Sequence, residues 1–230
     1  MPAHGTHDRG VATDSRIHGV PPDASKTRAG LLDAAARAFA RDGVFNASLI
    51  DITRQAGQRN RTALSYHFGS RDGVLCAVID RHAAFLAQRE GELLEVARQQ
   101  TALEPVVEAL VRPAAELADS GWRGRCCLLI IAELTGEDRA QYSAQLQDVL
   151  ASTGGNEVFA LLTERTGHLT DELRTERFSL MVMFILRAIA DRARLLERRT
   201  RHGRAQLEHE PFVGNLVAMA AAAMTAPAPR

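Results

Sequence analysis

The chain has 230 residues, of which 46% are hydrophobic and 24% charged, and this composition excludes a disordered or fibrous protein. The formal net charge is zero, but residues 25–75 hold eight basic and four acidic side chains, a net +4 that leaves −4 for the remainder. A basic module beside an acidic one indicates an anionic partner for the first, although a chance surface fluctuation explains the charge equally well.

The cysteines, the apolar segments and the length of the chain indicate its cellular compartment and its number of domains. The three cysteines are an odd number, so no disulfide framework is predicted. Residues 1–25 lack the apolar core of a signal peptide, and no run is apolar enough to span a bilayer convincingly. The sequence therefore predicts a cytoplasmic protein without a membrane partner. Its length fits one large domain, or a small domain joined to a larger one.

The predicted elements begin after a disordered arm, residues 1–24, which is rich in Gly, Pro, His and Asp. Residues 27–42 have apolar side chains at helical spacing, and a glycine follows at the position of a C-terminal cap. Ser48 and Asp51 then form a capping box that begins a short helix. A second short helix is predicted to be capped by Asn60 and to run to about His67.

Every later segment also has helical periodicity. Ser70 caps a long helix over residues 71–99. Because no segment alternates as a strand does, the predicted fold class is all-α. Residues 25–70 are expected to form a three-helix DNA-binding domain, and residues 71–226 a larger ligand-binding and dimerisation domain. Further helices are predicted over residues 104–118, 124–134, 139–151, 156–166, 171–199 and 212–224.

The two short helices are joined by a tight turn that contains Gly57, an arrangement typical of a helix-turn-helix. The second helix of this motif enters the major groove, where arginine suits a guanine edge and asparagine an adenine edge. A small helical hairpin with a polar surface is the alternative interpretation. The residues predicted to contact bases or phosphates are Ser48, Arg59, Asn60, Arg61, Thr62, Ser65, Tyr66, His67 and Arg71.

At this point the sequence resembles the TetR family of transcriptional regulators. The resemblance covers residues 27–82 and is most specific in the run Tyr66-His67-Phe68-Gly69-Ser70-Arg71-Asp72. It implies that the aromatic pair closes the recognition helix, and that Tyr66 and Arg71 contact phosphates. The turn departs from the family pattern, because residues 58–61 make it polar and slightly longer. The register of the base-contacting side chains therefore stays open.

The larger module contains a helix that is apolar nearly all round between residues 178 and 189. Such a helix cannot face water on one side, so a second copy of the chain is expected to cover it. The resemblance likewise implies a four-helix interface, while the central core helix of a monomer is the alternative. The predicted interface residues are Phe178, Val182, Phe184, Ile185, Ile189, Leu216 and Met219.

Helices of this module are also expected to enclose a mainly apolar pocket for a small-molecule effector whose identity the sequence does not give. By the resemblance, its binding would change the separation of the recognition helices and release DNA. Residues of these types are more often part of an ordinary core than of a pocket wall. The predicted lining is Phe85, Leu86, Trp122, Cys127, Ile130, Ile131, Phe159 and Met183.

Other chemistry is not indicated by the sequence. Cys126-Cys127 with His168 or His202 lacks the usual spacing of metal ligands. No nucleophile–base pair, phosphate loop or dinucleotide fingerprint occurs, so neither an enzyme nor a cofactor is predicted. The expected function is a homodimeric repressor that binds an inverted-repeat operator in double-stranded DNA. A helical ligand-binding or scaffold protein that does not bind DNA is the alternative.

Overall fold

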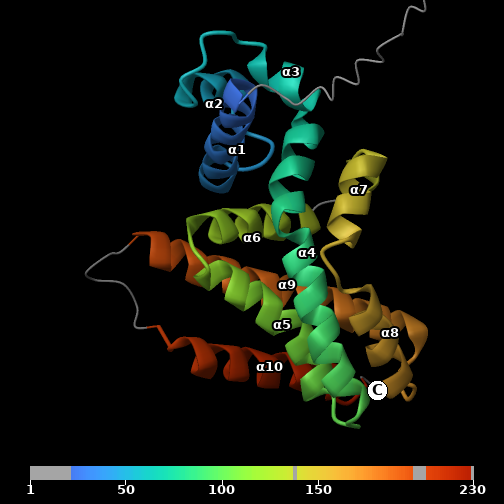
Figure 1. Ribbon diagram of the computed structural model, residues 1–230. Coiled ribbons are helices and arrows are strands. Elements are labelled where there is room, and N and C mark those ends of the chain that lie inside the picture. Colours follow the sequence, from blue (N-terminus) through green and yellow to red (C-terminus); the bar gives the residue numbers. More distant parts are fainter. Residues whose placement is uncertain (1–21, 137–138, 199–205, 229–230) are drawn as a thin grey trace, which may run out of the picture.

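The computed structural model describes residues 22–136, 139–198 and 206–228, and every regular element in these ranges is helical (Figure 1). The predicted all-α fold class is confirmed. The elements are α1 (Pro22–Asp42), α2 (Leu49–Gln55), α3 (Ala63–Phe68), α4 (Arg71–Arg98), α5 (Glu104–Asp119), α6 (Trp122–Thr135), the 3₁₀ turn η1 (Arg139–Gln141), α7 (Ala144–Ala151), α8 (Asn156–Arg165), α9 (Asp171–Arg198) and α10 (His209–Thr225).

Helix bounds agree with the sequence prediction to within a few residues at most positions. Helix α1 is longer than predicted, because it begins at Pro22, where a proline's missing N–H costs no helical hydrogen bond. The rest of the predicted N-terminal arm, residues 1–21, lies outside the described residues. The predicted helix over residues 139–151 is divided, because Ser143 caps α7 by accepting a hydrogen bond from the Leu146 amide.

Helices α1, α2 and α3 form a small module at one end of α4 (Figure 1). Its core is built from side chains that the helical spacing brings to the inner faces, with Leu31 and Phe39 from α1 and Ile52 from α2 fully buried. Leu64 of α3 joins them. These residues form the hydrophobic centre of the module, and the polar side chains of α3 lie on its outer face.

The larger module is arranged around α4, which runs from the small module to the opposite end of the molecule (Figure 1). Helix α5 packs along α4, α6 lies between α1 and α9, and α10 packs on α5 and α9. Ile130, Ile185 and Val213 contribute to its core, which is continuous with that of the small module. In the part of the chain that the structure describes, no helix is long and apolar enough to cross a membrane.

Candidate nucleic-acid interface and ligand pocket

Helix α2 is stabilised by hydrogen bonds of its own side chains and of its N-terminal cap. The Ser48 hydroxyl accepts a hydrogen bond from the Asp51 amide at 3.3 Å, as the capping motif predicts. The Asp51 carboxylate does not close the box, because it accepts from Arg54 at 2.7 Å instead. The Thr53 hydroxyl donates to the Leu49 carbonyl at 2.8 Å, so this buried polar group is satisfied within the helix. These hydrogen bonds stabilise α2 despite its short length, and α2 packs against α1.

The turn into α3 is longer than predicted. Gly57 has a φ of 73°, a left-handed value that a residue with a Cβ adopts only with strain. The predicted cap at Asn60 is wrong, because Thr62 holds the cap position and α3 begins at Ala63. The Asn60 side-chain oxygen accepts from the amide and the hydroxyl of Thr62, at 3.0 and 2.8 Å, and builds a turn. Since both its lone pairs are used, Asn60 cannot also read adenine with two bonds in this conformation.

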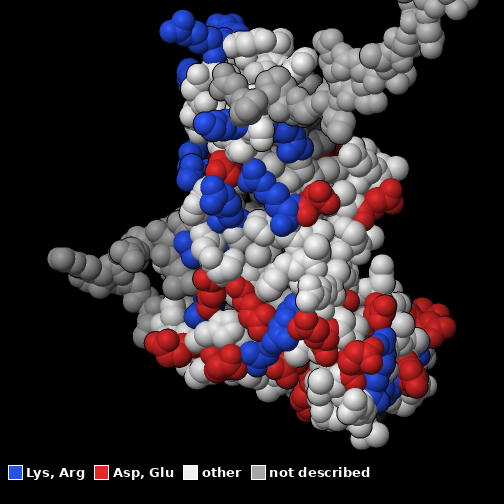
Figure 2. Space-filling view, in the orientation of Figure 1, with Lys and Arg blue, Asp and Glu red and all other residues white. Residues whose placement is uncertain are grey.

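The outer side of this turn and of α3 carries the other predicted contacts. Arg59, Arg61 and Ser65 are exposed, and Tyr66 is 84% exposed. The Tyr66 ring meets the half-buried His67 ring edge-on, with centroids 5.1 Å apart. Figure 2 shows Lys and Arg gathered over this end of the molecule, whereas most Asp and Glu lie over the other end. The structure thus brings one arginine-bearing loop and one aromatic side chain to a common exposed, basic surface.

Several arginines of the small module already have partners within the protein. Arg54 pairs with Asp51, and the Arg28 guanidinium lies 4.8 Å from the Phe68 ring centroid. Among the described residues, no acidic side chain pairs with Arg59 or Arg61. An exposed guanidinium without an internal partner keeps its donors available to an outside acceptor. These two side chains are therefore the strongest candidates for contacts to DNA.

Arg71 has a different place from the one that the resemblance implies. Its terminal nitrogens donate to the carbonyl oxygens of Val44 and Ala47, at 2.6 and 2.9 Å. Its guanidinium lies 5.8 Å from the Phe39 ring centroid. Arg71 is thus half-buried and ties α4 to the loop between α1 and α2. No sequence signal shows this role, because the acceptors are backbone atoms about 25 residues away.

Two further polar contacts connect the small module to α6. The Glu133 carboxylate accepts from the Val44 amide at 2.9 Å, and the Asp33 carboxylate accepts from Arg123 at 2.5 Å. Asp33 also accepts from Arg81 of α4 at 2.8 Å. Hydrogen bonding to Arg123 and then to Arg81, opposed by partial burial, lowers the Asp33 pKa below its ordinary value. Helices α4 and α6 therefore both hold the small module through polar side-chain contacts.

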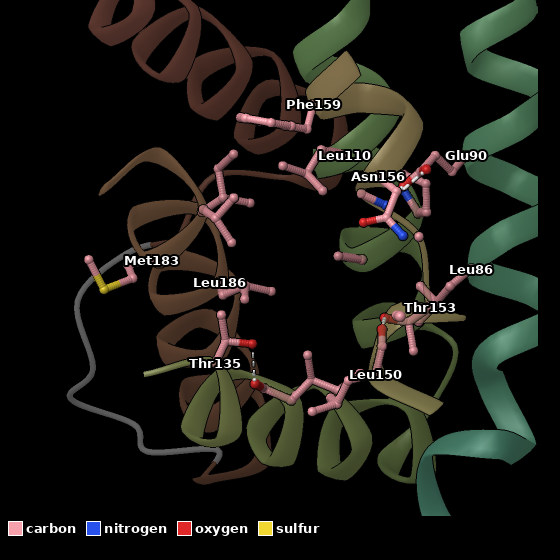
Figure 3. A pocket seen from close by; sticks show the side chains of 18 of the residues that line it. Leu86, Glu90, Leu110, Thr135, Leu150, Thr153, Asn156, Phe159, Met183 and Leu186 are labelled. Atoms are coloured by element: carbon pink, nitrogen blue, oxygen red, sulfur yellow. Dashed lines mark hydrogen bonds between the residues drawn. The ribbon is translucent and has the colours of Figure 1, made fainter. Parts of the chain in front are cut away.

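The same two helices line a cavity of about 430 Å³ in the larger module (Figure 3). Leu128, Ile131 and Thr135 of α6 face it at spacings of three and four residues, which place them on one side of the helix. The rest of the wall comes from α4, α5, the α7–α8 turn, α8 and α9. This volume lies within the range of about 300–1,000 Å³ that is usual for small-molecule sites.

Four of the eight residues predicted to line a pocket do so, and four lie elsewhere. Phe85 is exposed on the outer side of α4, and the guanidinium groups of Arg37 and Arg123 lie 3.8 and 4.6 Å from the Trp122 ring centroid. Cys127 and Ile130 are buried on a different side of α6, where burial raises the pKa of the Cys127 thiol to about 12. The predicted residues that line the cavity are Leu86, Ile131, Phe159 and Met183.

Sequence analysis missed Glu90, which is buried in the cavity wall although it lies between Arg89 and Gly91 in a polar stretch. Its position could have been found from spacing, because it follows Leu86 and precedes Leu94 by four residues on the buried side of α4. A glutamate at a core position of a helix is uncommon, which makes Glu90 the most informative residue of the wall.

The predicted interface residues fall into three groups. Ile185, Ile189 and Leu216 are at most 3% exposed, since their own protomer covers them. Phe178 and Val182 line the cavity, and the Phe178 ring lies 4.5 Å from that of Phe159. Phe184 and Met219, by contrast, are 39% and 51% exposed. Helix α9 is therefore mostly covered within one chain, and a narrower exposed face remains.

Comparison with known proteins gives a fold but no close relative. No family model matches the sequence, and no curated protein matches it. The solved structure of AibR, in complex with isovaleryl coenzyme A and operator DNA, has a TM-score of 0.50. It is 16% identical and covers 84% of this chain and 97% of its own.

The chain has the TetR-family fold. A TetR-family regulator from Streptomyces coelicolor is 16% identical over 90% of this chain and 99% of its own, with a TM-score of 0.43. NalD, the secondary repressor of the MexAB-OprM multidrug efflux pump in Pseudomonas aeruginosa, is 18% identical over 86% and 95%, with a TM-score of 0.46. In this TetR-like fold the exposed basic turn lies before the start of α4, and the cavity is lined by Leu86 and Glu90 further along that helix.

Proposed function

We propose that this protein is a cytoplasmic, homodimeric transcriptional repressor that binds an inverted-repeat operator and leaves it when a small, mainly apolar molecule fills the cavity. One observation carries the proposal: the exposed, unpaired guanidinium groups of Arg59 and Arg61 stand directly before α3. The presence of operator DNA in the AibR structure supports it at the level of the fold.

Contact with DNA would begin at this basic surface. A major groove admits one helix, and an arginine at its start can donate two hydrogen bonds to a guanine edge. In this account Arg61 reads a base, while Arg59 and Tyr66 contact phosphates on either side. The Asn60–Thr62 hydrogen bonds hold the turn that aims Arg61 outward. Ser65 and His67 lie on the same short helix and complete the proposed surface.

Dimerisation would use the exposed face of α9 and α10. Leu180, Phe184 and Met219 leave a large part of their apolar surface in contact with water. Ala218 and Ala222 lie beside Met219 on α10, and such small side chains permit close approach of a second helix. Two copies joined in this way would present two α3 helices. A palindromic operator would place its half-sites about 34–36 Å apart, or a multiple of that.

Release of DNA would depend on helices that both line the cavity and contact the small module. Ile131 and Thr135 line the cavity, and Glu133, between them on α6, holds the Val44 amide of the small module. A ligand can shift the protein from a DNA-binding to a released arrangement only if it binds the two with different affinity. A cavity bounded by α4 and α6 meets that condition if filling it moves either helix.

The experiment that tests this function compares Arg61→Ala with Arg98→Ala, which removes the same charge at the far end of α4. Operator fragments are first selected from genomic DNA with the wild-type protein and searched for inverted repeats. Arg61→Ala should then weaken operator binding by about 1–3 kcal/mol, while its binding to unrelated DNA changes much less.

Arg98→Ala should leave both affinities unchanged, as its guanidinium pairs with Glu95 and Glu157. If the wild-type protein selects no double-stranded fragment even at low ionic strength, the DNA-binding function is wrong. The helical ligand-binding or scaffold protein would then be the better account.

A further inference from the structure

The cavity wall has a single charged side chain among the described residues that line it, Glu90 of α4. Most of the wall is apolar, and Figure 3 shows Leu110, Phe159 and Leu186 around the same space as Glu90. The hydroxyl of Thr135 donates to the Ile131 carbonyl at 2.8 Å, so it is already engaged. No lysine or arginine lines the described wall. A ligand that fills this space therefore meets one acidic group in apolar surroundings.

The Glu90 carboxylate is buried and is held by the backbone of the α7–α8 turn. The residue is only 7% exposed, and both carboxylate oxygens accept from the Gly155 amide, at 2.9 and 2.7 Å. Gly154 has a φ of 110°, and a Cβ at that position would overlap the carboxylate. The α7–α8 turn thus depends on two adjacent glycines to bring its backbone against Glu90. The two contacts share a single N–H, so the backbone gives the carboxyl group only one donor.

The charge on Glu90 has no positive partner among the described residues. The neighbouring Arg89 turns to Glu92 and Glu116, each at 2.9 Å. Burial raises the Glu90 pKa, the hydrogen bond from Gly155 opposes that rise, and the negative charge of Glu157 adds to it. An ionised carboxylate has room for about four hydrogen bonds, and one amide supplies far fewer. Burying an ionised carboxylate with so few hydrogen bonds costs free energy, and a cation beside it would lower that cost.

We propose that the effector is an apolar molecule carrying one protonated amine, whose ammonium group pairs with the Glu90 carboxylate while its body fills the cavity. The inference rests on the proposed function only in treating this cavity as the effector site. An organic anion would place its charge beside Glu90 with no described basic side chain to receive it. A neutral molecule would fill the apolar space but would leave the carboxylate without a counter-ion.

The first test measures binding to the free wild-type protein at pH 7 by calorimetry, without DNA. The probes are ω-phenylalkyl amines of increasing chain length, together with the alcohols and carboxylates of the same carbon skeletons. The best amine should bind about ten- to a hundredfold more tightly than its alcohol, as expected for a charge-assisted hydrogen bond in a buried site. The matching carboxylate should bind more weakly than the alcohol.

The second test uses Glu90→Gln, which removes the charge and keeps an acceptor for the Gly155 amide. Its affinity for the best amine should fall about ten- to a hundredfold, while its affinity for the alcohol stays within about threefold. Glu92→Gln is the matched control, since it removes the same charge from the exposed side of α4 and should bind both probes as the wild type does.

Two results would overturn the inference: carboxylates that bind the wild type as tightly as amines, or a Glu90→Gln variant that keeps its affinity for the amine. The wild-type probe series gives an answer even if the variant does not fold. Because no DNA is present, the outcome is also separate from the DNA-binding test. A protein that binds amines but no operator would contradict the proposed function and leave the ligand class standing.

Discussion

Arg71 occupies the first position of α4, and its guanidinium is held by the loop that follows α1. Its two terminal nitrogens satisfy the Val44 and Ala47 carbonyls, which would otherwise lack a partner at the junction. Hydrogen bonds from a charged donor are stronger than neutral ones, at about 1.5–3 kcal/mol each. Arg71 is therefore one of the side chains that hold the small module against the helix that leads to the cavity.

We expect Arg71→Ala to lower the free energy of unfolding by about 2–3 kcal/mol, because it removes both hydrogen bonds. Chemical denaturation measures this change. Arg59→Ala is the matched arginine variant, and it should alter stability by less than about 0.5 kcal/mol, since Arg59 is exposed. It should instead reduce the salt dependence of DNA binding by about one phosphate contact. The reverse pattern would assign Arg71 to the phosphate backbone.

Helix α6 is the element that connects the cavity to the small module of α1, α2 and α3. One side of it lines the cavity through Ile131, and its ends hold the small module through Arg123 and Glu133. The Arg123–Asp33 contact also includes Arg81 of α4, so Asp33 joins three helices at one point. Helices that touch both sites can carry energetic coupling between them, provided that they have two arrangements.

The Asp33 contact predicts a specific dependence on pH. Its folded-state pKa is lowered, so the stability that it contributes is present above the unfolded value, about 3.9, and is lost as pH falls below it. Asp33→Asn should therefore cost about 1 kcal/mol at pH 7, a modest value because its partners are partly exposed.

Unfolding free energies of the wild type and Asp33→Asn, measured from pH 7 to pH 3, check this prediction. The difference between the two proteins should shrink below about pH 4. A difference that stays constant over the whole range would show that Asp33 contributes through packing or neutral hydrogen bonds instead of through its charge.

At the scale of the whole molecule, apolar residues of α9 and α10 are of two kinds: some are exposed on one face, and others are buried within their own chain. Phe184 is 39% exposed, whereas Ile189, five residues later on the same helix, is 1% exposed. The first is available to a second copy of the chain, and the second belongs to the core of its own protomer. The same substitution at the two positions should therefore have different consequences.

Phe184→Glu should give a folded monomer, because the new carboxylate faces the proposed partner and stays in water in the free chain. Ile189→Glu should prevent folding, since a lone charge would be buried in the core. Light scattering gives the mass and circular dichroism the helical content of each variant. A Phe184→Glu protein that remains a stable dimer would place the interface elsewhere.

Much of the architecture was predictable because local signals are strong in this chain. Helical spacing of apolar residues, Ser48 and Ser70 as caps, and Gly57 in the turn indicated the helices and their order. These signals act over a few residues, within the range of a capping hydrogen bond or a turn. For the same reason, the exposed arginines before α3 could be named from the sequence alone.

Tertiary structure alone decided which apolar residues face a cavity, a core or a partner. Leu86 and Phe85 are neighbours, yet only Leu86 reaches the cavity, because the crossing of α4 and α5 determines which side is covered. Contacts of Glu90 with Gly155 and of Arg71 with Val44 join distant backbone atoms. No local pattern records such pairings, because they exist only after the helices have packed.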